Sequence, residues 1–456
     1  MDIDKIQNYF FIGIAGTGMS AIAQYLKGIG KEVSGSDRLF EKGICDIEQK
    51  LNNEGILTFK QDGSGINEKT SLVVVSSAIE ENNIELKNAA RIGIPVVHRA
   101  DLLASLAKTK KTIAVTGTSG KSTTSAMIWH ILDKSGIPAS FIGGAGLVEL
   151  QIYGKIGNAV ANKGEWLVIE ADESDGSLVK YFPEVGIIIN IDKDHKEIEE
   201  LESIFNIFKN QIKGRLIVNQ SHPRARSFSV NRNNDFGVEA ECGFNAKNFV
   251  QEGFKIKFEI NNVGFEVPVI GKHNMENAVA AVAACSVAGV DLIKASVALK
   301  TYKGIYRRHQ FLGLINGVYL IDDYAHNPSK LAASVRACQF GTGNLHLWFQ
   351  PHGFQPTRFL RYEFVQELLK VLRENDGVWM SEIFYAGGTV SKNISANDLI
   401  KDLEKSHQKA YFIENRNEFP DNLKPHLRAG DIVLLTGARD PSLDDFAQFV
   451  KKKLMD

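Results

Sequence analysis

Short apolar runs alternate with stretches of helical periodicity along the first 107 residues. The apolar runs predict strands and the periodic stretches predict helices. Strands are expected at residues 10–14, 31–33, 71–76 and 95–98, and helices at 19–28 and 81–92. Regular alternation of this kind is typical of a parallel, doubly wound sheet with helices on both faces.

A similar α/β pattern recurs in two further stretches, roughly 108–300 and 301–456. The middle stretch has strand runs at 113–115, 166–170 and 185–191, an alternating segment at 254–269 that predicts an antiparallel pair, and an alanine-rich helix at 274–289. The last stretch has strand runs at 319–321, 345–349, 377–380 and 431–436, and helical patterns at 329–338, 361–374 and 444–453. The whole chain is therefore predicted to be α/β, with mainly parallel sheets.

Composition narrows the class of protein. With 44% hydrophobic and 23% charged residues in 456, a globular protein with an ample core is expected. A net charge of −1 gives no reason to expect a nucleic-acid or membrane surface. Four scattered cysteines fit a reducing compartment, and the short N-terminal apolar run follows no basic region, so a cytoplasmic location is expected.

The most informative motif follows the apolar run 113–115 and reads GTSGKST at residues 117–123. A glycine turn between a strand and a helix points backbone N–H groups and the positive helix end at an anion. Lys121 can reach a β- or γ-phosphate, and the Ser122 hydroxyl can bind Mg²⁺. Val115 stands where the longer form of this loop has a glycine, so the loop is a shorter variant. It predicts a nucleoside triphosphate site without specifying the reaction.

A second glycine turn lies near the N-terminus, at Gly13, Gly16 and Gly18. Its spacing departs from the usual dinucleotide fingerprint, yet a glycine turn at a helix N-terminus suits a diphosphate. Asp37 ends the second strand, where an acid can bind a ribose or a base edge. Plain packing of the helix against the strand is the alternative interpretation of these residues.

Acidic residues gather after two buried strands of the middle stretch. Residues 170–175 read EADESD and residues 192–195 read DKDH. Carboxylates there are able to hold Mg²⁺ opposite the phosphate loop, and His195 is able to bind a second cation or the substrate. A solvated acidic loop and a surface histidine are the alternatives.

Two further polar clusters open helices. In the segment 271–277, GKHNMEN, the side chains of Asn274 and Asn277 either cap the alanine-rich helix or recognise an adenine edge. Residues 322–328, DDYAHNP, place paired carboxylates, a tyrosine and a histidine at one strand end, soon after Arg307 and Arg308. Joint placement of such groups at the carboxyl end of a strand indicates a site.

Taken in order, these motifs resemble the Mur ligase family over essentially the full chain. GTSGKST, EADESD, DKDH, GKHNMEN, YRRHQ and DDYAHNP follow the family order, and FIGIAGTGMSAIA, GIPVVHRADLLA and FQPH are most similar to the branch that adds L-alanine to UDP-N-acetylmuramate. The resemblance implies a Rossmann-like UDP-substrate-binding domain at 1–107 and a central phosphate-loop ATP-binding domain at 108–300. A C-terminal Rossmann-like domain at 301–456 would bind the amino acid.

The resemblance also implies a reaction. ATP phosphorylates the lactyl carboxylate of UDP-N-acetylmuramate to an acyl phosphate, and the amine of L-alanine then displaces phosphate, in peptidoglycan precursor synthesis. Lys121, Glu173 and His195 would be catalytic, and Ser122, Glu173 and His195 would hold Mg²⁺. The protein is expected to be a monomer or a homodimer, without nucleic-acid or membrane partners.

Carried over residue by residue, the resemblance assigns three groups of binding residues. ATP would be bound by Gly117, Thr118, Ser119, Gly120, Lys121, Ser122, Thr123, Asn274, Arg308 and Asp323. The UDP substrate would be bound by Gly16, Thr17, Gly18, Asp37, Ser76, His98 and Arg99. The amino acid would be bound by Tyr324, His326 and Arg358.

The largest departure from the family lies directly after FQPH. The alanine-adding branch has two arginines there that help to bind the carboxylate of the incoming amino acid, and Gly353 and Pro356 stand in their places. Neither residue can replace a bidentate arginine–carboxylate contact. Arg358 is a candidate substitute. Two alternatives stay open: a ligase with another acceptor, such as a recycled muropeptide tripeptide or a different amino acid, and a non-catalytic nucleotide-binding paralogue.

Overall fold

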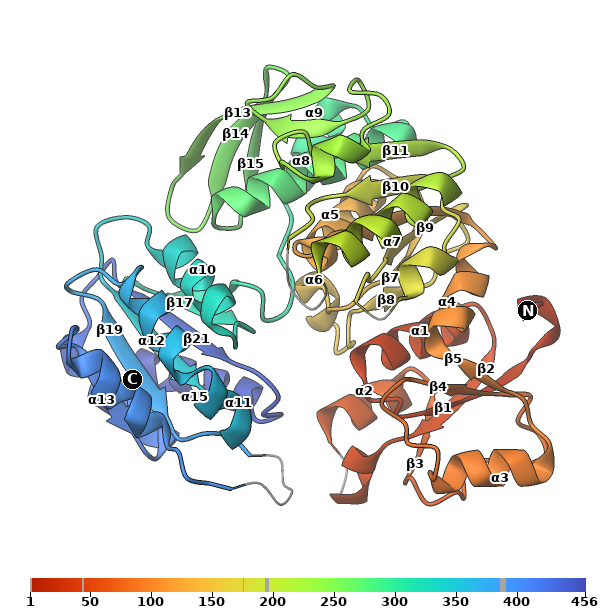
Figure 1. Cartoon of the computed structure of the whole chain (residues 1–456), viewed down its shortest axis with the longest axis horizontal. Coiled ribbons are helices and arrows are strands. Elements are labelled where there is room, and N and C mark those ends of the chain that lie inside the picture. Colours follow the sequence, from red (N-terminus) through yellow and green to blue (C-terminus); the bar gives the residue numbers. More distant parts are fainter. Residues whose placement is uncertain (1, 43–44, 175, 193–196, 386–390) are drawn as a thin grey trace. The chain divides into compact units, whose positions relative to one another are not determined.

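The computed structural model describes residues 2–42, 45–174, 176–192, 197–385 and 391–456 (Figure 1). The chain divides into two compact units. The first comprises Met1–Val250, Lys257–Pro268 and His273–Ile305, and the second comprises Gln251–Ile256, Val269–Lys272 and Tyr306–Asp456.

The N-terminal sheet of the first unit has the strand order β3-β2-β1-β4-β5, and every neighbouring pair is parallel. Its strands are β1 (Asn8–Ile12), β2 (Glu32–Ser36), β3 (Leu57–Phe59), β4 (Leu72–Val75) and β5 (Val96–His98). Its helices are α1 (Thr17–Gly28), α2 (Asp46–Asn53), α3 (Ile84–Ile92) and α4 (Arg99–Ala107). β1 is the central strand and is almost wholly buried, because helices cover both faces of such a sheet. The predicted doubly wound sheet is confirmed.

The central sheet of the first unit has the order β11-β10-β6-β9-β7-β8, with only the β7–β8 pair antiparallel among its described strands. Its strands are β6 (Lys111–Thr116), β7 (Ala139–Ile142), β8 (Ala159–Val160), β9 (Trp166–Glu170), β10 (Val185–Ile188) and β11 (Arg215–Val218). Helices α5 (Lys121–Lys134), α6 (Val148–Gln151) and α7 (Ile198–Gln211) accompany it. One apolar cluster includes Tyr25 and Leu26 of α1 together with Ile142 and Ile169, so it joins the two sheets.

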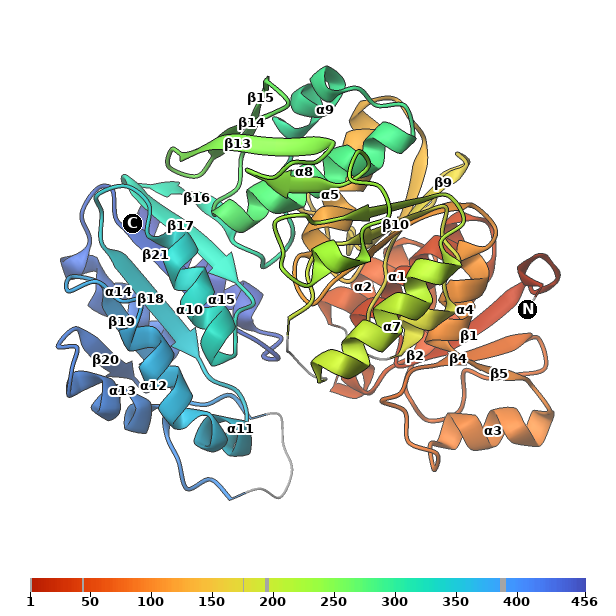
Figure 2. The ribbon, with the colours of Figure 1, turned by 45° about the horizontal axis from the view of Figure 1, so that its top comes forward.

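A smaller sheet completes this part of the chain, with the order β12-β13-β14-β15. Its strands are β12 (Phe236–Val238), β13 (Phe244–Gln251), β14 (Ile256–Ile260) and β15 (Val263–Val267). Asn261 and Asn262 have φ values of 51° and 67° and form the two-residue turn between β14 and β15, so the predicted antiparallel pair is confirmed. Helices α8 (Lys272–Val287) and α9 (Leu292–Leu299) follow, and α9 packs against β15 (Figure 2).

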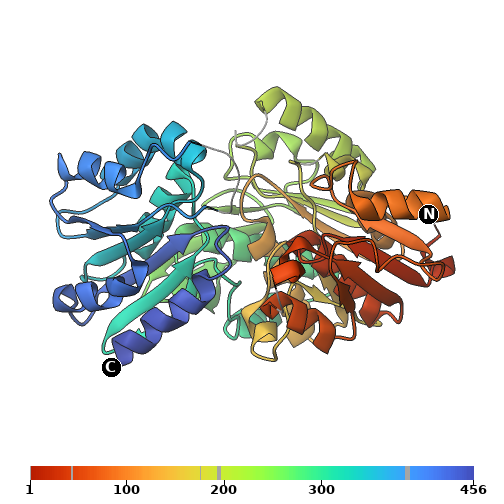
Figure 3. The same cartoon turned by 90° about the horizontal axis from the view of Figure 1, so that it is seen from below.

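The sheet of the second unit has the order β16-β17-β21-β18-β19-β20, and only its β16–β17 pair is antiparallel among the described strands. Its strands are β16 (Gln310–Ile315), β17 (Val318–Asp323), β18 (Leu345–Gln350), β19 (Gly377–Ser381), β20 (Ala410–Ile413) and β21 (Ile432–Gly437). Its helices are α10 (Pro328–Cys338), α11 (Phe354–Phe359), α12 (Arg361–Leu369), α13 (Ala396–Glu404), α14 (Phe419–Leu423) and α15 (Leu443–Met455). Apolar clusters with α10, α12 and α13 on one side and with α14 and α15 on the other cover the two faces (Figure 3).

Some elements differ from the sequence prediction. The helix expected at 361–374 ends at Leu369, and α7 was not anticipated at all. The alanine-rich helix begins at Lys272 rather than at residue 274. Within the described residues, no helix combines the length and the apolar character that a membrane crossing requires.

Candidate active site

The phosphate loop connects β6 to α5 as predicted, at the carboxyl edge of the central sheet. Gly120 caps α5 with φ of 84°, a backbone conformation that favours glycine, and a Cβ there would lie 2.4 Å from the Asn277 side-chain oxygen. Gly117 has φ of 142°, and a Cβ there would lie 3.1 Å from the backbone of Asn190. Both glycines are therefore needed for the loop to take this shape.

Asn190 braces the loop from the end of the neighbouring strand. Its side-chain oxygen accepts hydrogen bonds from the Thr118 hydroxyl at 2.9 Å and from the Ser119 N–H at 2.8 Å. Its amide nitrogen donates to the Ser119 carbonyl at 3.1 Å. Sequence reasoning missed this residue, although an asparagine that ends an apolar run at the same sheet edge as the loop was a usable signal.

Lys121 lies within a group of carboxylates. Its ammonium donates to the Gly117 carbonyl and to Glu173, both at 2.8 Å, and lies 3.7 Å from Asp172. Burial works against the charge on Lys121, but Glu173, Asp172 and Glu170 outweigh it and raise the pKa of the lysine. Burial raises the pKa of the Glu173 carboxyl, and the attraction of Lys121 only partly compensates. The structure thus brings together the two predicted residues, with the ammonium over the loop.

Ser122 and Glu170 form a second contact beside Lys121. The Ser122 hydroxyl donates to Glu170 at 2.8 Å, and the same carboxylate oxygen accepts from the Gly144 N–H at 2.9 Å. Three carboxylates, those of Glu170, Asp172 and Glu173, therefore surround one lysine and one hydroxyl. Hard oxygen donors suit Mg²⁺. Among the described residues, however, no group of three or more His, Cys, Asp or Glu side chains is placed to hold a metal ion, so the predicted metal stays a prediction.

The second acidic segment reaches the loop through its first residue. The Asp192 N–H donates to the Thr118 hydroxyl at 3.1 Å, and the Asp192 carboxylate lies 3.2 Å from Nε2 of His222. His222 was not a predicted site residue. The predicted His195 lies outside the described residues.

Asn274 and Asn277 lie inside α8 rather than at its start. The interpretation of either residue as a helix cap is therefore wrong, because α8 begins at Lys272. The Asn277 amide donates to the Asn274 side-chain oxygen at 3.1 Å, and the Asn277 oxygen lies 3.3 Å from the Thr124 hydroxyl. Asn277 thus links α8 to α5 just behind the phosphate loop.

The N-terminal glycine turn is organised by Asp37. Its carboxylate accepts from the Ala15 N–H at 3.0 Å and from the Leu39 N–H at 3.0 Å. A Cβ on Gly18 would lie 2.8 Å from the Arg99 guanidinium, so these two predicted residues are neighbours. Gly16 caps α1, which Thr17 opens, and the Thr17 carbonyl accepts from Asn158 of the central domain at 2.8 Å.

The remaining predicted residues of the N-terminal domain occupy strand ends. Ser76 directly follows β4. His98 ends β5 and caps α4, with its Nδ1 3.2 Å from the Ala100 N–H. Arg99 opens α4 and lowers the pKa of Asp172, where burial acts against it and Lys121 contributes more. The electrostatic influence of Arg99 thus reaches the acidic cluster around Lys121.

In the second unit, the carboxylates of Asp322 and Asp323 make mainly structural contacts. Buried Arg307 donates to Asp322 at 3.0 Å and to the Gly437 carbonyl at 2.9 Å. Burial raises the pKa of Asp322 to about 6, although Arg307 draws it down. Asp323 accepts from the N–H groups of Ala325 and His309, both at 2.8 Å. These bonds fix the loop that follows β17.

The other predicted residues of this unit surround that loop. The exposed Arg308 guanidinium lies 5.5 Å from the centre of the Tyr324 ring, and the rings of Tyr324 and His326 are 5.4 Å apart. Arg358 lies on α11, where its guanidinium donates to the Ser391 carbonyl at 3.1 Å and to the Asn393 side chain. Arg358 is therefore already engaged by its own unit.

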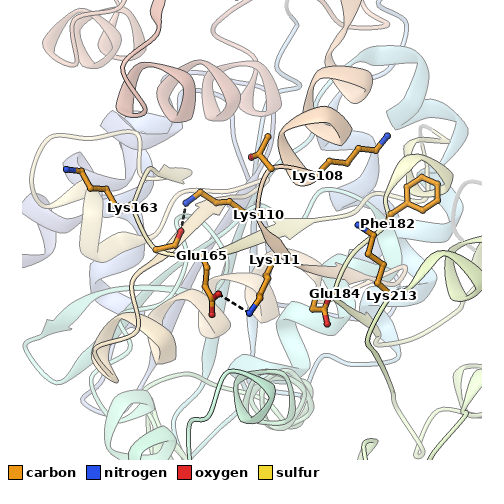
Figure 4. A pocket seen from close by; sticks show the side chains of 10 residues that line it. Lys108, Lys110, Lys111, Lys163, Glu165, Phe182, Glu184 and Lys213 are labelled. Atoms are coloured by element: carbon orange, nitrogen blue, oxygen red, sulfur yellow. Dashed lines mark hydrogen bonds and ion pairs between the residues drawn. The ribbon is translucent and has the colours of Figure 1, made fainter. Parts of the chain in front are cut away.

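A pocket of about 490 Å³ lies away from the phosphate loop, beside the starts of the central strands (Figure 4). Lysines dominate its lining, but Lys111 pairs with Glu165 at 2.9 Å and Lys110 donates to the carbonyls of Asn162 and Gly164. Figure 4 shows Lys108 and Lys163 pointing away from each other. These ammonium groups do not converge on one position, so the pocket does not compete with the phosphate loop as the active site.

Comparisons with known proteins agree with this geometry. The Mur ligase family matches along the chain, as "Mur ligase family, catalytic domain" at residues 8–111, "Mur ligase middle domain" at 115–285 and "Mur ligase, glutamate ligase domain" at 307–439. A UDP-N-acetylmuramate–L-alanine ligase from Pelotomaculum thermopropionicum is 35% identical over 96% of both chains.

Two solved structures share the fold. A UDP-N-acetylmuramate-alanine ligase from Thermotoga maritima aligns with a TM-score of 0.81 and 24% identity over 98% of both chains. A murein peptide ligase from Psychrobacter arcticus aligns with a TM-score of 0.67 and 20% identity over 99% of both chains. The three-domain α/β prediction is thereby confirmed. The chain belongs to the Mur ligase family and is an ATP-dependent ligase.

Proposed function

We propose that this ligase joins the lactyl carboxylate of UDP-N-acetylmuramate to L-alanine through an acyl phosphate, in peptidoglycan precursor synthesis for the cell wall. The observation that carries the proposal is the contact of Lys121 with both the Gly117 carbonyl and Glu173, at the phosphate loop. The name and the near full-length similarity of the Pelotomaculum relative support the choice of substrates.

The physical need for such a site is clear. A carboxylate is a poor electrophile, and phosphorylation supplies a leaving group. Negative charge gathers on the transferred phosphoryl group, so Lys121 has the role of neutralising it from a fixed position. Ser122 and Glu173 would hold Mg²⁺ here, together with His195, and the metal would supply further charge stabilisation. Because burial raises the pKa of Glu173, that carboxylate gains from a nearby cation.

The binding residues divide by domain in this proposal. Residues 1–107 bind the UDP substrate through Gly16, Thr17, Gly18, Asp37, Ser76, His98 and Arg99. Residues 108–300 bind ATP through the loop 117–123 and Asn274, with Arg308 and Asp323 contributing from residues 301–456. Tyr324 and His326 belong to the acceptor side. Support comes from the phosphate loop before α5, the glycine turn before α1 and the strand ends at Asp37, Ser76, His98 and Asp323.

One observation favours a second candidate acceptor. Gly353 has φ of 73° and caps α11, and a Cβ there would lie 3.2 Å from the ring of Pro356. At Gly353 this backbone gives no place for an arginine without a rearrangement of the turn. A ligase of the same chemistry that takes a muropeptide tripeptide, or another amino acid, is therefore the alternative.

The test is a product analysis with ATP, Mg²⁺ and UDP-N-acetylmuramate that carries ¹⁸O in its carboxyl group. L-Alanine, a pool of other amino acids and the tripeptide are supplied in parallel. We expect ¹⁸O in the released phosphate and the L-alanine adduct in the mass spectrum. Turnover with the tripeptide alone would reject L-alanine but keep the chemistry. Amide formation without label in the phosphate would reject the acyl phosphate.

A further inference from the structure

Arg439 occupies an unusual place in the second unit. It follows β21 and has φ of 65°, a conformation that side chains other than glycine and asparagine rarely adopt. β21 lies between β17 and β18 and is parallel to both. Arg439 therefore leaves the sheet at the same edge as His326, which comes after β17, and His352, which comes after β18.

The carboxylates at this edge already have partners. Asp440 accepts from Arg416 at 2.6 Å, and Asp322 accepts from Arg307 at 3.0 Å. By contrast, Arg439 is exposed and makes no hydrogen bond or ion pair with any residue that the structure describes. Within the described part of the chain, the segment after β21 thus presents a guanidinium without a hydrogen-bond or ion-pair partner.

The charge of Arg439 also acts on the two histidines. Burial is the main cause that lowers the pKa of His326 and His352, and the positive charge of Arg439 contributes to both shifts. The rings of the two histidines lie 5.3 Å apart. Nδ1 of His326 lies 2.9 Å from the Tyr324 carbonyl, so it carries the proton, and Nε2 keeps a lone pair. His352 keeps Nδ1 buried without a hydrogen-bond partner among the described residues.

We propose that Arg439 binds the carboxylate of the amine acceptor and so makes this ligase select acceptors with a free carboxylate. The inference rests on the proposed function and deepens it. A planar guanidinium can hold a carboxylate through two parallel hydrogen bonds, which is what Gly353 and Pro356 cannot do. The neutral Nε2 of His326 is then available to accept a hydrogen bond from the acceptor's amino group. Arg358 is less suited, because its Nη2 already donates to Ser391 and Asn393.

The test compares Arg439→Ala, Arg439→Lys and the control Arg336→Ala, an exposed arginine on α10. The substrates are L-alanine, or whichever acceptor the product analysis identifies, and its carboxamide analogue. We expect Arg439→Ala to raise KM for the acceptor by about 10- to 100-fold while KM for ATP stays unchanged. Arg439→Lys should recover part of the loss in acceptor binding, because lysine keeps the positive charge but cannot donate two parallel hydrogen bonds. With the carboxamide, wild type and Arg439→Ala should behave alike.

The failures of the two proposals are distinguishable. Wild-type turnover combined with an unchanged KM in Arg439→Ala would overturn the role of Arg439 and leave the ligase activity intact. An equal loss with the acid and the carboxamide would also overturn it, because that pattern marks a structural role. A wild-type enzyme that releases no phosphate with any amine would reject the proposed function itself, and this inference with it.

Discussion

The carboxyl edges of the central sheet and of the C-terminal sheet carry opposite charge patterns. At the central edge, Glu170, Asp172 and Glu173 lie around the ammonium of Lys121. At the C-terminal edge, the carboxylates are paired or bonded to backbone, and Arg439 remains exposed near two histidines of lowered pKa. Parallel sheets of the same architecture thus present one edge where carboxylates accompany the phosphate loop and one edge where an arginine is exposed. The charges and not the fold decide what each edge binds.

The largest expected effect comes from removing the ammonium of Lys121 at the central edge. Lys121→Ala should lower ligase turnover about 1,000-fold or more, because the charge on the phosphoryl group then lacks its fixed counter-charge. Phosphate release with saturating substrates measures the effect. The control is Lys134→Ala, on the exposed end of the same helix, where Lys134 contacts Asp133 and Glu149. Turnover of Lys121→Ala within tenfold of wild type would contradict the assigned role.

The next largest effect should come from breaking the buried ion pair between Arg307 and Asp322 at the C-terminal edge. Arg307→Ala leaves Asp322 buried without its cation, which costs about 3 kcal/mol in the free energy of unfolding. Denaturant unfolding of the full chain measures it. Lys405→Ala removes an exposed partner of Asp402 in the same unit and should cost below about 1 kcal/mol. Equal losses for the two variants would show that the buried pair does not support this edge.

Local patterns were enough to predict the sheets and the phosphate loop. Apolar runs predicted the strands because buried parallel strands are apolar on both faces, and the glycine-lysine-serine spacing placed Lys121 at a helix start. Contacts between segments that are distant along the chain could not be predicted from these local patterns. Asn190 contacts the loop from the end of another strand. Arg439 comes to the same sheet edge as the two histidines only because β21 lies between β17 and β18. The cap interpretation of Asn274 failed because the helix starts two residues earlier.

The next prediction concerns Asn190, which holds the phosphate loop at the central edge. Asn190→Ala leaves the Thr118 hydroxyl and the Ser119 N–H without their acceptor, so we expect about a tenfold rise in KM for ATP and a stability loss of about 1–2 kcal/mol. Asn190→Asp keeps the acceptor but adds a negative charge beside the phosphates. It should recover stability without recovering ATP binding. If Asn190→Asp bound ATP like wild type, the loop would not be sensitive to charge at this position.

The smallest expected effect concerns pH. As the pH falls, the contributions of His352 and Glu173 to stability should change in opposite directions. Burial, with His326 and Arg439, lowers the pKa of His352 to about 4, whereas the unfolded chain titrates near the ordinary value of 6.5. Below pH 6.5 the unfolded state takes up a proton that the folded state refuses, so this histidine makes stability fall as pH drops toward 4.

Glu173 has a raised pKa, so the folded state protonates it more readily than the unfolded state does, and its contribution to stability rises as pH falls. Unfolding free energies at pH 7.5 and 5.5 test the contrast. When the pH is lowered from 7.5 to 5.5, the free energy of unfolding of His352→Gln should fall by about 1 kcal/mol less than that of wild type. The free energy of unfolding of Glu173→Gln should fall by more than that of wild type. Changes of the same sign in both variants would contradict the two shifts, which burial drives in opposite directions for an acid and a base. A wild-type response from His352→Gln alone would show that burial does not lower the pKa of that histidine.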